Sequence, residues 1–96
     1  MAAPLSDIEI RRELSALSGW VRRGDALVKT FEFPTFPAAI AFVNGVADAA
    51  ESAHHHPDLD IRYTKVTCSL STHSAGGITR RDFSLAAAID RVVDGS

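Results

Sequence analysis

The 96-residue sequence predicts a single α+β domain, in which a four-stranded antiparallel sheet carries its helices on one face. Along the chain, the spacing of apolar residues switches between the three-to-four-residue period of a helix and the two-residue period of a strand. Taken in order, these segments run α-β-β-α-β-β-α. The chain is too short to divide into two independent cores. Residues 1–96 are therefore expected to form one domain, whose other sheet face is free for a ligand or a partner.

The first helix is expected to begin after Ser6, because Ser6 and Glu9 occupy the two positions of a capping box. Beyond it, apolar residues recur at the spacing of one buried helix face: Ile10, Leu14 and Leu17. Ser18-Gly19 ends this helix.

Four segments have the pattern of strands: 20–23, 26–33, 61–63 and 65–72. Gly24-Asp25 between the first two predicts a tight hairpin turn. In the last segment, apolar side chains alternate with small polar ones, so His73 is expected on the polar face with Ser69 and Ser71.

Two further helices complete the fold. One starts at Phe36 and is expected to end between residues 53 and 55, because Pro57 cannot continue it. Its predicted apolar stripe is Phe36, Ile40, Val43, Ala47 and Ala50. The other opens at Thr79, and its predicted apolar positions are Phe83, Ala86, Ile89 and Val93.

The composition excludes several classes of protein. The net charge is −2, so no broad basic surface for nucleic acid is expected. The single cysteine cannot form an internal disulfide and is typical of a reducing compartment. No apolar run is long enough to cross a membrane, and the N-terminus lacks the pattern of a signal peptide. A cytoplasmic protein is expected, and pairing of an exposed sheet edge with a second copy would protect that edge.

Three of the four histidines stand in a row, at His54, His55 and His56. A remnant of a purification tag does not fit a run that lies between a helix and a strand. Adjacent side chains on an extended segment diverge, so a zinc site would combine at most two of the three with His73, Glu51 or Asp58. A polar helix end is a further interpretation, because the helix dipole favours imidazolium there. The last interpretation is acid–base chemistry, in which His55 or His56 and His73 transfer protons in a cleft. Glu51 would orient His55 from one helical turn away.

Two other residues have both a structural and a functional interpretation. Asp82 takes the reciprocal place of a capping box opened by Thr79, which is a sufficient structural role. Trp20, the only tryptophan, is equally suited to the core and to stacking on a flat ligand.

Together these residues resemble the pterin-4a-carbinolamine dehydratase family. The pattern is Glu51, three residues, then His55-His56-Pro57, a strand ending in Ser71-Thr72-His73, and Thr79-Arg80-Arg81-Asp82. Gly19-Trp20 and the apolar last helix also match. The resemblance covers about residues 6–93, whereas His54 lies outside the family pattern and the turn after Trp20 is shorter than in many relatives.

The resemblance implies a small cytoplasmic hydro-lyase that assembles as a homodimer or homotetramer. Its substrate would be 4a-hydroxytetrahydrobiopterin, the pterin-4a-carbinolamine left by an aromatic amino acid hydroxylase. Loss of water gives quinonoid dihydropterin, so the enzyme would serve tetrahydrobiopterin recycling. The resemblance implies no metal and no cofactor, no direct binding of nucleic acid and no membrane partner.

The resemblance also implies roles for single residues. His55 and His73 would exchange protons with the pterin, and His56 would orient it and share in proton transfer. Glu51 would hold the histidine pair. The remaining residues expected to bind substrate or complete the pocket are Trp20, Pro57, Thr72, Ser74, Ala75 and Asp82.

A second function is open on the same sequence. The family includes a member that stabilises dimers of a transcription factor through its helical face. The alternative is therefore a non-catalytic binding or dimerisation module that acts as a transcriptional or assembly cofactor.

Overall fold

The computed structural model describes residues 3–95 and confirms the predicted order of elements, α-β-β-α-β-β-α. The helices are α1 (Asp7–Leu14), α2 (Phe36–Ala53) and α3 (Arg80–Gly95), with a short 3-10 turn η1 (His73–Ala75) before α3. The strands are β1 (Val21–Arg23), β2 (Ala26–Glu32), β3 (Asp58–Arg62) and β4 (Lys65–Leu70). They form one antiparallel sheet in the order β1-β2-β4-β3.

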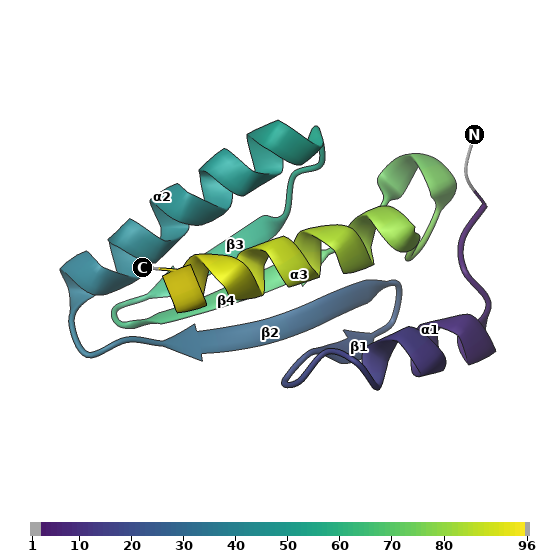
Figure 1. The fold of residues 1–96 in the computed structure, drawn as a ribbon, viewed down its shortest axis with the longest axis horizontal. Helices are drawn as coiled ribbons and strands as arrows, with labels where there is room; N and C mark the ends of the chain where they lie inside the picture. Colours follow the sequence, from purple (N-terminus) through teal and green to yellow (C-terminus); the bar gives the residue numbers. More distant parts are fainter. Residues whose placement is uncertain (1–2, 96) are drawn as a thin grey trace.

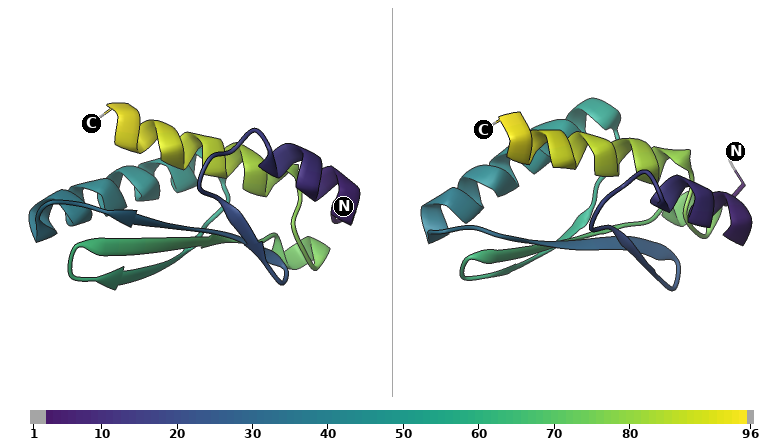
Figure 2. Two further views of the ribbon diagram at one scale, coloured as in Figure 1. Left: turned by 90° about the horizontal axis from the view of Figure 1, so that it is seen from below. Right: turned by 60° about the horizontal axis from the view of Figure 1, so that its bottom comes forward.

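The helices cover one face of the sheet. Helices α2 and α3 cross that face side by side, and α1 lies near the N-terminal end of α3 (Figures 1 and 2). Two ion pairs join α1 to α3, from Arg80 to Glu9 (3.9 Å) and to Glu13 (3.5 Å). Within residues 3–95, the other sheet face carries no helix, as the sequence predicts (Figure 2).

Local signals in the sequence explain most element boundaries. Ser6 and Glu9 form the predicted capping box, with Ser6 Oγ accepting from the Glu9 amide at 3.2 Å. The β1–β2 hairpin turns at Gly24 and Asp25, and Gly24 has the positive φ of 59° that such a turn requires at its first position. At the start of α2, Thr35 caps the helix by accepting from the Ala38 amide at 3.2 Å.

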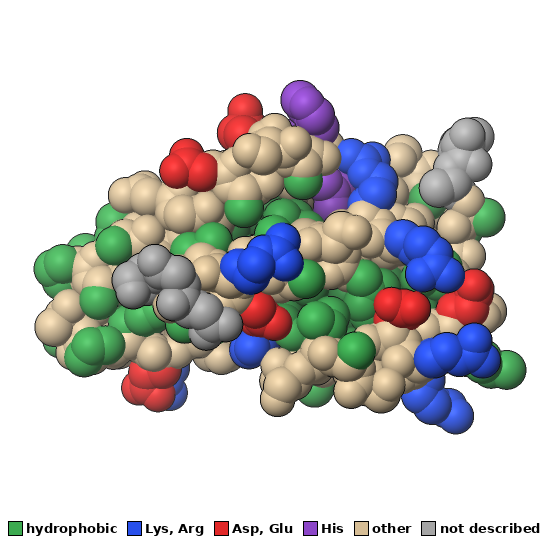
Figure 3. All heavy atoms as spheres, in the orientation of Figure 1, with side chains coloured by type: hydrophobic (Ala, Val, Ile, Leu, Met, Phe, Trp, Pro, Cys, Tyr) green, Lys and Arg blue, Asp and Glu red, His purple; other side chains and the backbone are tan. Residues whose placement is uncertain are grey.

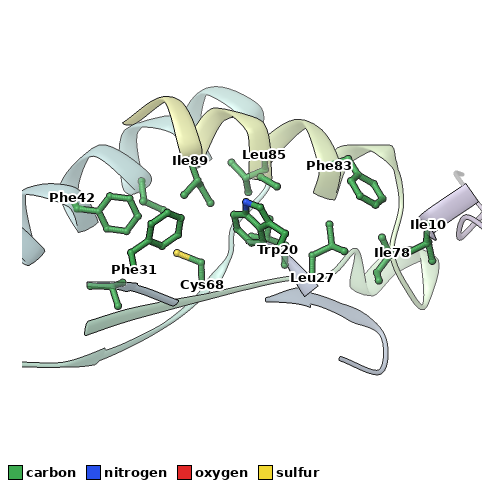
Figure 4. Packing of buried hydrophobic residues seen from close by; sticks show 14 of the residues in the cluster. Ile10, Trp20, Leu27, Phe31, Phe42, Cys68, Ile78, Phe83, Leu85 and Ile89 are labelled. Atoms are coloured by element: carbon green, nitrogen blue, oxygen red, sulfur yellow. The ribbon is translucent and has the colours of Figure 1, made fainter. Parts of the chain in front are cut away.

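The core lies between the sheet and the two long helices (Figure 4). The predicted alternation in β4 is confirmed, because Val66, Cys68 and Leu70 are all fully buried. In α3 the predicted positions Phe83, Ala86 and Ile89 are buried, and Val93 packs partly against the core. Burial, followed by the nearby charge of Asp90, raises the pKa of the Cys68 thiol to about 12.

Three predictions about elements need correction. The buried stripe of α2 is Ala39, Phe42, Val46 and Ala50, whereas Phe36 is 46% exposed. This helix is apolar on most of its circumference, so two stripes fit the period and only packing selects one. Helix α1 ends at Leu14, before Leu17, and the chain continues through turns to Gly19.

The third correction concerns the last two strands. Strand β3 begins at Asp58, three residues earlier than predicted, because it pairs residue by residue with β4. Tyr63 belongs to the turn that follows, with a positive φ of 55° and an exposed side chain. Strand β4 ends at Leu70, so His73 lies beyond the strand in η1 and the two-residue alternation does not reach it. Within the part of the chain that the structure describes, no helix is long and apolar enough to span a bilayer.

Candidate active site

The histidine run begins where α2 ends. His54 terminates the helix in the left-handed conformation, with φ 50° and ψ 41°. The His55 amide donates to the Ala50 carbonyl at 3.1 Å, which closes the last turn. Through this change of direction the next two side chains part: His55 is buried, with 8% of its surface exposed, and His56 is exposed.

His55 is held by a buried carboxylate. Its Nε2 lies 2.5 Å from Oδ1 of Asp82, a residue with no exposed surface. The other oxygen of Asp82, Oδ2, accepts from the Thr72 hydroxyl at 2.8 Å and from the Thr79 amide at 2.9 Å. A buried carboxylate needs such donors, because burial removes its hydrogen bonds to water.

Asp82 combines the predicted helix cap with a contact to His55. It stands at the third position of α3, where Oδ2 accepts from the amide of the cap residue Thr79. In return, the Thr79 hydroxyl accepts from the amide of Arg81 at 3.2 Å, one position earlier than in a standard capping box. The cap therefore leaves Oδ1 of the same carboxylate for His55.

His56 and Glu51 form a separate pair on the surface. Nε2 of His56 lies 2.5 Å from Oε2 of Glu51, and both side chains are mostly exposed. The expectation that Glu51 orients His55 is thus wrong, because Glu51 contacts His56 instead. Because the backbone turns at His54, the helical spacing of four residues no longer applies, and the imidazole within reach of Glu51 is that of His56.

His73 follows the end of β4, which pairs with the start of β3 just after the histidine run, and it lines the same cavity as His55 and His56. It opens η1 directly after Thr72, is exposed, and its ring forms no hydrogen bond within residues 3–95. Gly76 ends η1 with a positive φ of 75°, and Thr72 is bridged to Gly77, which folds the loop back on itself. The 3-10 turn therefore presents His73 at the surface beside the end of α2.

A surface cavity of about 260 Å³ connects these groups. Histidine side chains gather at the C-terminal end of α2 next to a basic side chain (Figure 3). The lining residues are His54, His55, His56, Ser71, Thr72, His73, Ser74 and Arg81. Three histidines predicted to act together, with Thr72 and Ser74, are thus brought to one place.

The other predicted pocket residues lie around or away from this cavity. Asp82 lies behind His55, Glu51 flanks His56, and Pro57 follows as the residue that stops the helix. Ala75 is half-buried in η1. Thr72 lines the cavity but is 3% exposed, and its hydroxyl proton is donated to Asp82, so a substrate contact from its backbone stays a prediction and one donated by its hydroxyl does not fit.

Trp20 belongs to the core (Figure 4). It is 4% exposed, packs edge-on against Phe31, and its Nε1 donates to both oxygens of Asp90 at 3.1 Å. Lys29 donates to the same carboxylate at 3.0 Å. Of the two interpretations open on the sequence, the structural one applies, so Trp20 supports the fold and offers this cavity no stacking surface.

Arg81 also lines the cavity, although the sequence pattern does not predict it as a site residue. Its Nη2 donates to the His54 carbonyl at 2.5 Å, so α3 holds the residue that turns the histidine run. The pair Arg80-Arg81 has the pattern of a solvated surface, and the signal that marks Arg81 is its position directly before Asp82, a predicted site residue. Within the described residues, no three histidine, cysteine or acidic side chains converge as ligands for a metal ion.

The sequence matches known proteins along nearly its whole length. Residues 3–92 match the family model described as pterin 4 alpha carbinolamine dehydratase. A relative from Roseiflexus castenholzii, named "Putative pterin-4-alpha-carbinolamine dehydratase", is 59% identical over 93 residues, which cover 97% of this chain and all of the relative. A relative of the same name from Chloroflexus aurantiacus is 52% identical over 89 residues, covering 93% of this chain and 96% of the relative.

Solved structures show the same fold. A crystal structure of a transcriptional coactivator/pterin dehydratase from Brucella melitensis superposes with a TM-score of 0.89 at 32% identity, covering 93% of this chain and 97% of that one. A pterin dehydratase-like protein, identified as a RuBisCO assembly factor in the alpha-carboxysome, superposes with a TM-score of 0.68 at 25% identity, covering 81% of this chain and 93% of that one. From the family match and these relatives, the chain belongs to the pterin-4a-carbinolamine dehydratase family.

Proposed function

We propose that the protein dehydrates 4a-hydroxytetrahydropterin to quinonoid dihydropterin and water. The observation that carries this proposal is the convergence of His55, His56 and His73 on one cavity, in a chain of this family. Its volume of about 260 Å³ is near the lower end of small-molecule sites, which suits a compact heterocycle.

The reaction needs one proton donor and one proton acceptor. The C4a hydroxyl leaves as water once it gains a proton, and N5 loses a proton as the C4a=N5 bond forms. Imidazole is the side chain that gives and takes protons near neutral pH. His55 and His73 would exchange these protons, and His56 would orient the pterin and share in the transfer. The described residues bring these imidazoles together from two elements, the end of α2 and η1.

The test is a carbinolamine dehydration assay in buffer with a metal chelator. We expect the wild type to be active there and the His55→Ala/His73→Ala double variant to lose at least about 100-fold in kcat. Thr30→Val is the control, because Thr30 pairs with Thr67 on the sheet face that carries no helix and does not line the cavity. Full activity in the double variant would contradict the proposal, and activity lost to the chelator would favour a zinc protein instead.

A second candidate function rests on the outer surface of α2. Phe36 is 46% exposed, and Ile40 and Val43 are only half-buried, so an apolar strip is left on this helix. The structural relatives described as a coactivator and as an assembly factor make a protein-binding role the alternative. A Phe36→Glu variant should then lose self-association into a homodimer or homotetramer, or capture of a protein partner, while the histidine double variant keeps both. Sedimentation measures the first and pull-down the second.

A further inference from the structure

The hydrogen bonds behind His55 form a chain in which each donor is determined. The Arg81 amide donates to the Thr79 hydroxyl oxygen at 3.2 Å. The Thr72 hydroxyl gives its one proton to Asp82 Oδ2 at 2.8 Å. The contact of 2.8 Å between the two threonine hydroxyls must therefore use the Thr79 proton. The chain runs from Arg81 through Thr79 and Thr72 to Asp82.

This chain separates the two oxygens of Asp82. Oδ2 receives two protein donors, the Thr72 hydroxyl and the Thr79 amide, and so can only be an acceptor. Asp82, Thr72 and Thr79 are 0%, 3% and 2% exposed, and hydrogen bonds in such an environment are strong and costly to leave unmade. Oδ1 is left to the imidazole of His55 alone among the described residues.

The consequence for His55 concerns the position of its proton. Facing a carboxylate oxygen at 2.5 Å, Nε2 must be the protonated nitrogen, so the neutral ring has its lone pair on Nδ1. Nδ1 forms no hydrogen bond within residues 3–95. Every buried side-chain nitrogen or oxygen of the described chain has a partner, so Nδ1 must be in contact with solvent. The cavity is the open space that His55 lines.

We propose that Thr72 and Thr79 are positioning residues that, through Asp82, hold His55 in the tautomer with Nε2 protonated and Nδ1 free. For catalysis the proposal rests on the proposed function. Nδ1 of His55 then accepts the N5 proton of the carbinolamine, and the N5–H electron pair forms the C4a=N5 bond. The C4a hydroxyl leaves as water after it takes a proton from His73, the general acid. The charge that develops on His55 faces the Asp82 carboxylate.

A purely structural role for the threonines makes a different prediction. If they only cap α3 and satisfy a buried carboxylate, their loss would lower the free energy of unfolding and leave the His55 proton where it is. The tautomer of His55 therefore decides between the two roles, and it can be measured without any activity.

The experiment uses long-range ¹H–¹⁵N spectra of the full chain with ¹⁵N-labelled histidine, which report the protonated nitrogen of each neutral ring. We expect Nε2–H for His55 in the wild type. In Asp82→Asn, the two donors at Oδ2 should hold the amide oxygen there and turn its NH₂ toward His55. The tautomer should then invert to Nδ1–H.

The threonine variants test the positioning role itself. Thr72→Val removes one donor from Oδ2, so the second tautomer should appear and kcat should fall about 10- to 100-fold with little change in KM. Thr72→Ser keeps the hydroxyl, so it should show the wild-type tautomer of His55 and the wild-type kcat. The matched control is Thr30→Val, which removes a similar threonine pair on the open sheet face, where Thr30 Oγ1 lies 2.8 Å from Thr67 Oγ1.

Three outcomes would overturn the proposal: Nδ1–H for neutral His55 in the wild type, an unchanged tautomer in Asp82→Asn, or a folded Thr72→Val variant with unchanged tautomer and kcat. The first two need no Thr72 variant, so they decide the question even if Thr72→Val fails to fold. Should the wild type not dehydrate the carbinolamine, the proposed function fails, and the spectra still decide whether the chain positions His55.

Discussion

His54 contributes to the site through its backbone. Its left-handed conformation separates the buried ring of His55 from the exposed ring of His56, and its carbonyl accepts from Arg81 at 2.5 Å. A residue with a Cβ is strained in this conformation, by roughly 1–2 kcal/mol. His54 lies outside the family pattern and its side chain has no hydrogen-bond partner within the described residues, but its backbone directs the side chains of His55 and His56.

This strain leads to a prediction about stability. His54→Gly removes the Cβ and should be about 1 kcal/mol more stable than His54→Ala, which keeps the strain. Urea denaturation of the two variants measures the difference as a shift of midpoint at constant slope. Equal midpoints would show that the left-handed backbone at this position is not strained.

Among the elements, the contact between α2 and α3 depends on one glycine. A Cβ built on Gly45 of α2 would lie 2.5 Å from Cγ1 of Val92 on α3. Contact this close requires a residue without a side chain. The glycine therefore permits a close approach of α2, which leads into His55, to α3, which carries Asp82, and the hydrogen bond between His55 and Asp82 connects the end of α2 to the start of α3.

Gly45→Ala should destabilise the fold by a net of about 1 kcal/mol. Overpacking costs about 1–3 kcal/mol, and the better helix propensity of alanine returns about 1 kcal/mol. The rotamer of Val92 gives way little, because a valine in a helix has one preferred χ1. Chemical denaturation measures the change.

The control for this prediction is the same substitution in a Val92→Ala background. There the clashing methyl is gone, and Gly45→Ala should be neutral or stabilising. An equal cost in both backgrounds would mean that the glycine is needed for some other reason than close packing.

On the scale of the whole molecule, ion pairs between surface side chains connect α1 to the sheet and to α3. Asp7 pairs with Arg22 at the edge of the sheet at 2.6 Å, and this hydrogen bond and charge lower the pKa of Asp7. The Ser6 amide, donating to the Glu9 carboxylate, lowers the pKa of Glu9. Both groups are exposed, so their individual contributions are small and screened by salt.

The sign of the resulting pH dependence follows from linkage. A carboxyl group whose pKa is lowered by folding stabilises the fold above its unfolded pKa, and this stabilisation is lost as the pH falls through the folded value. The wild type should therefore be more stable than an Asp7→Asn/Glu9→Gln variant at neutral pH, and this difference in the free energy of unfolding should disappear below about pH 4. Urea midpoints of both proteins at about pH 7 and about pH 3 test this. The same difference in midpoint at both pH values would contradict this prediction.

Much of the fold follows from local patterns in the sequence. The capping signals at Ser6 and Thr79, the turn at Gly24-Asp25 and the alternation in β4 each depend on neighbours within a few residues. Such signals predict element order and type well, because the interactions that cause them are local. The buried stripe of α2 was missed, because a helix that is apolar nearly all round presents several faces that could pack.

The order of the elements, the family pattern, and the choice of the histidines that line the cavity and of the aspartate behind His55 follow from the amino-acid sequence. The pairing of these groups follows from three-dimensional packing alone: Asp82 contacts His55, Glu51 contacts His56, and Trp20 contacts Asp90. The physical reason is that each pairing depends on a change of backbone direction or on the packing of distant elements. The left-handed turn at His54 cancels the helical spacing that the sequence suggests, and the packing of α3 on α2 brings Asp82 to a histidine 27 residues away.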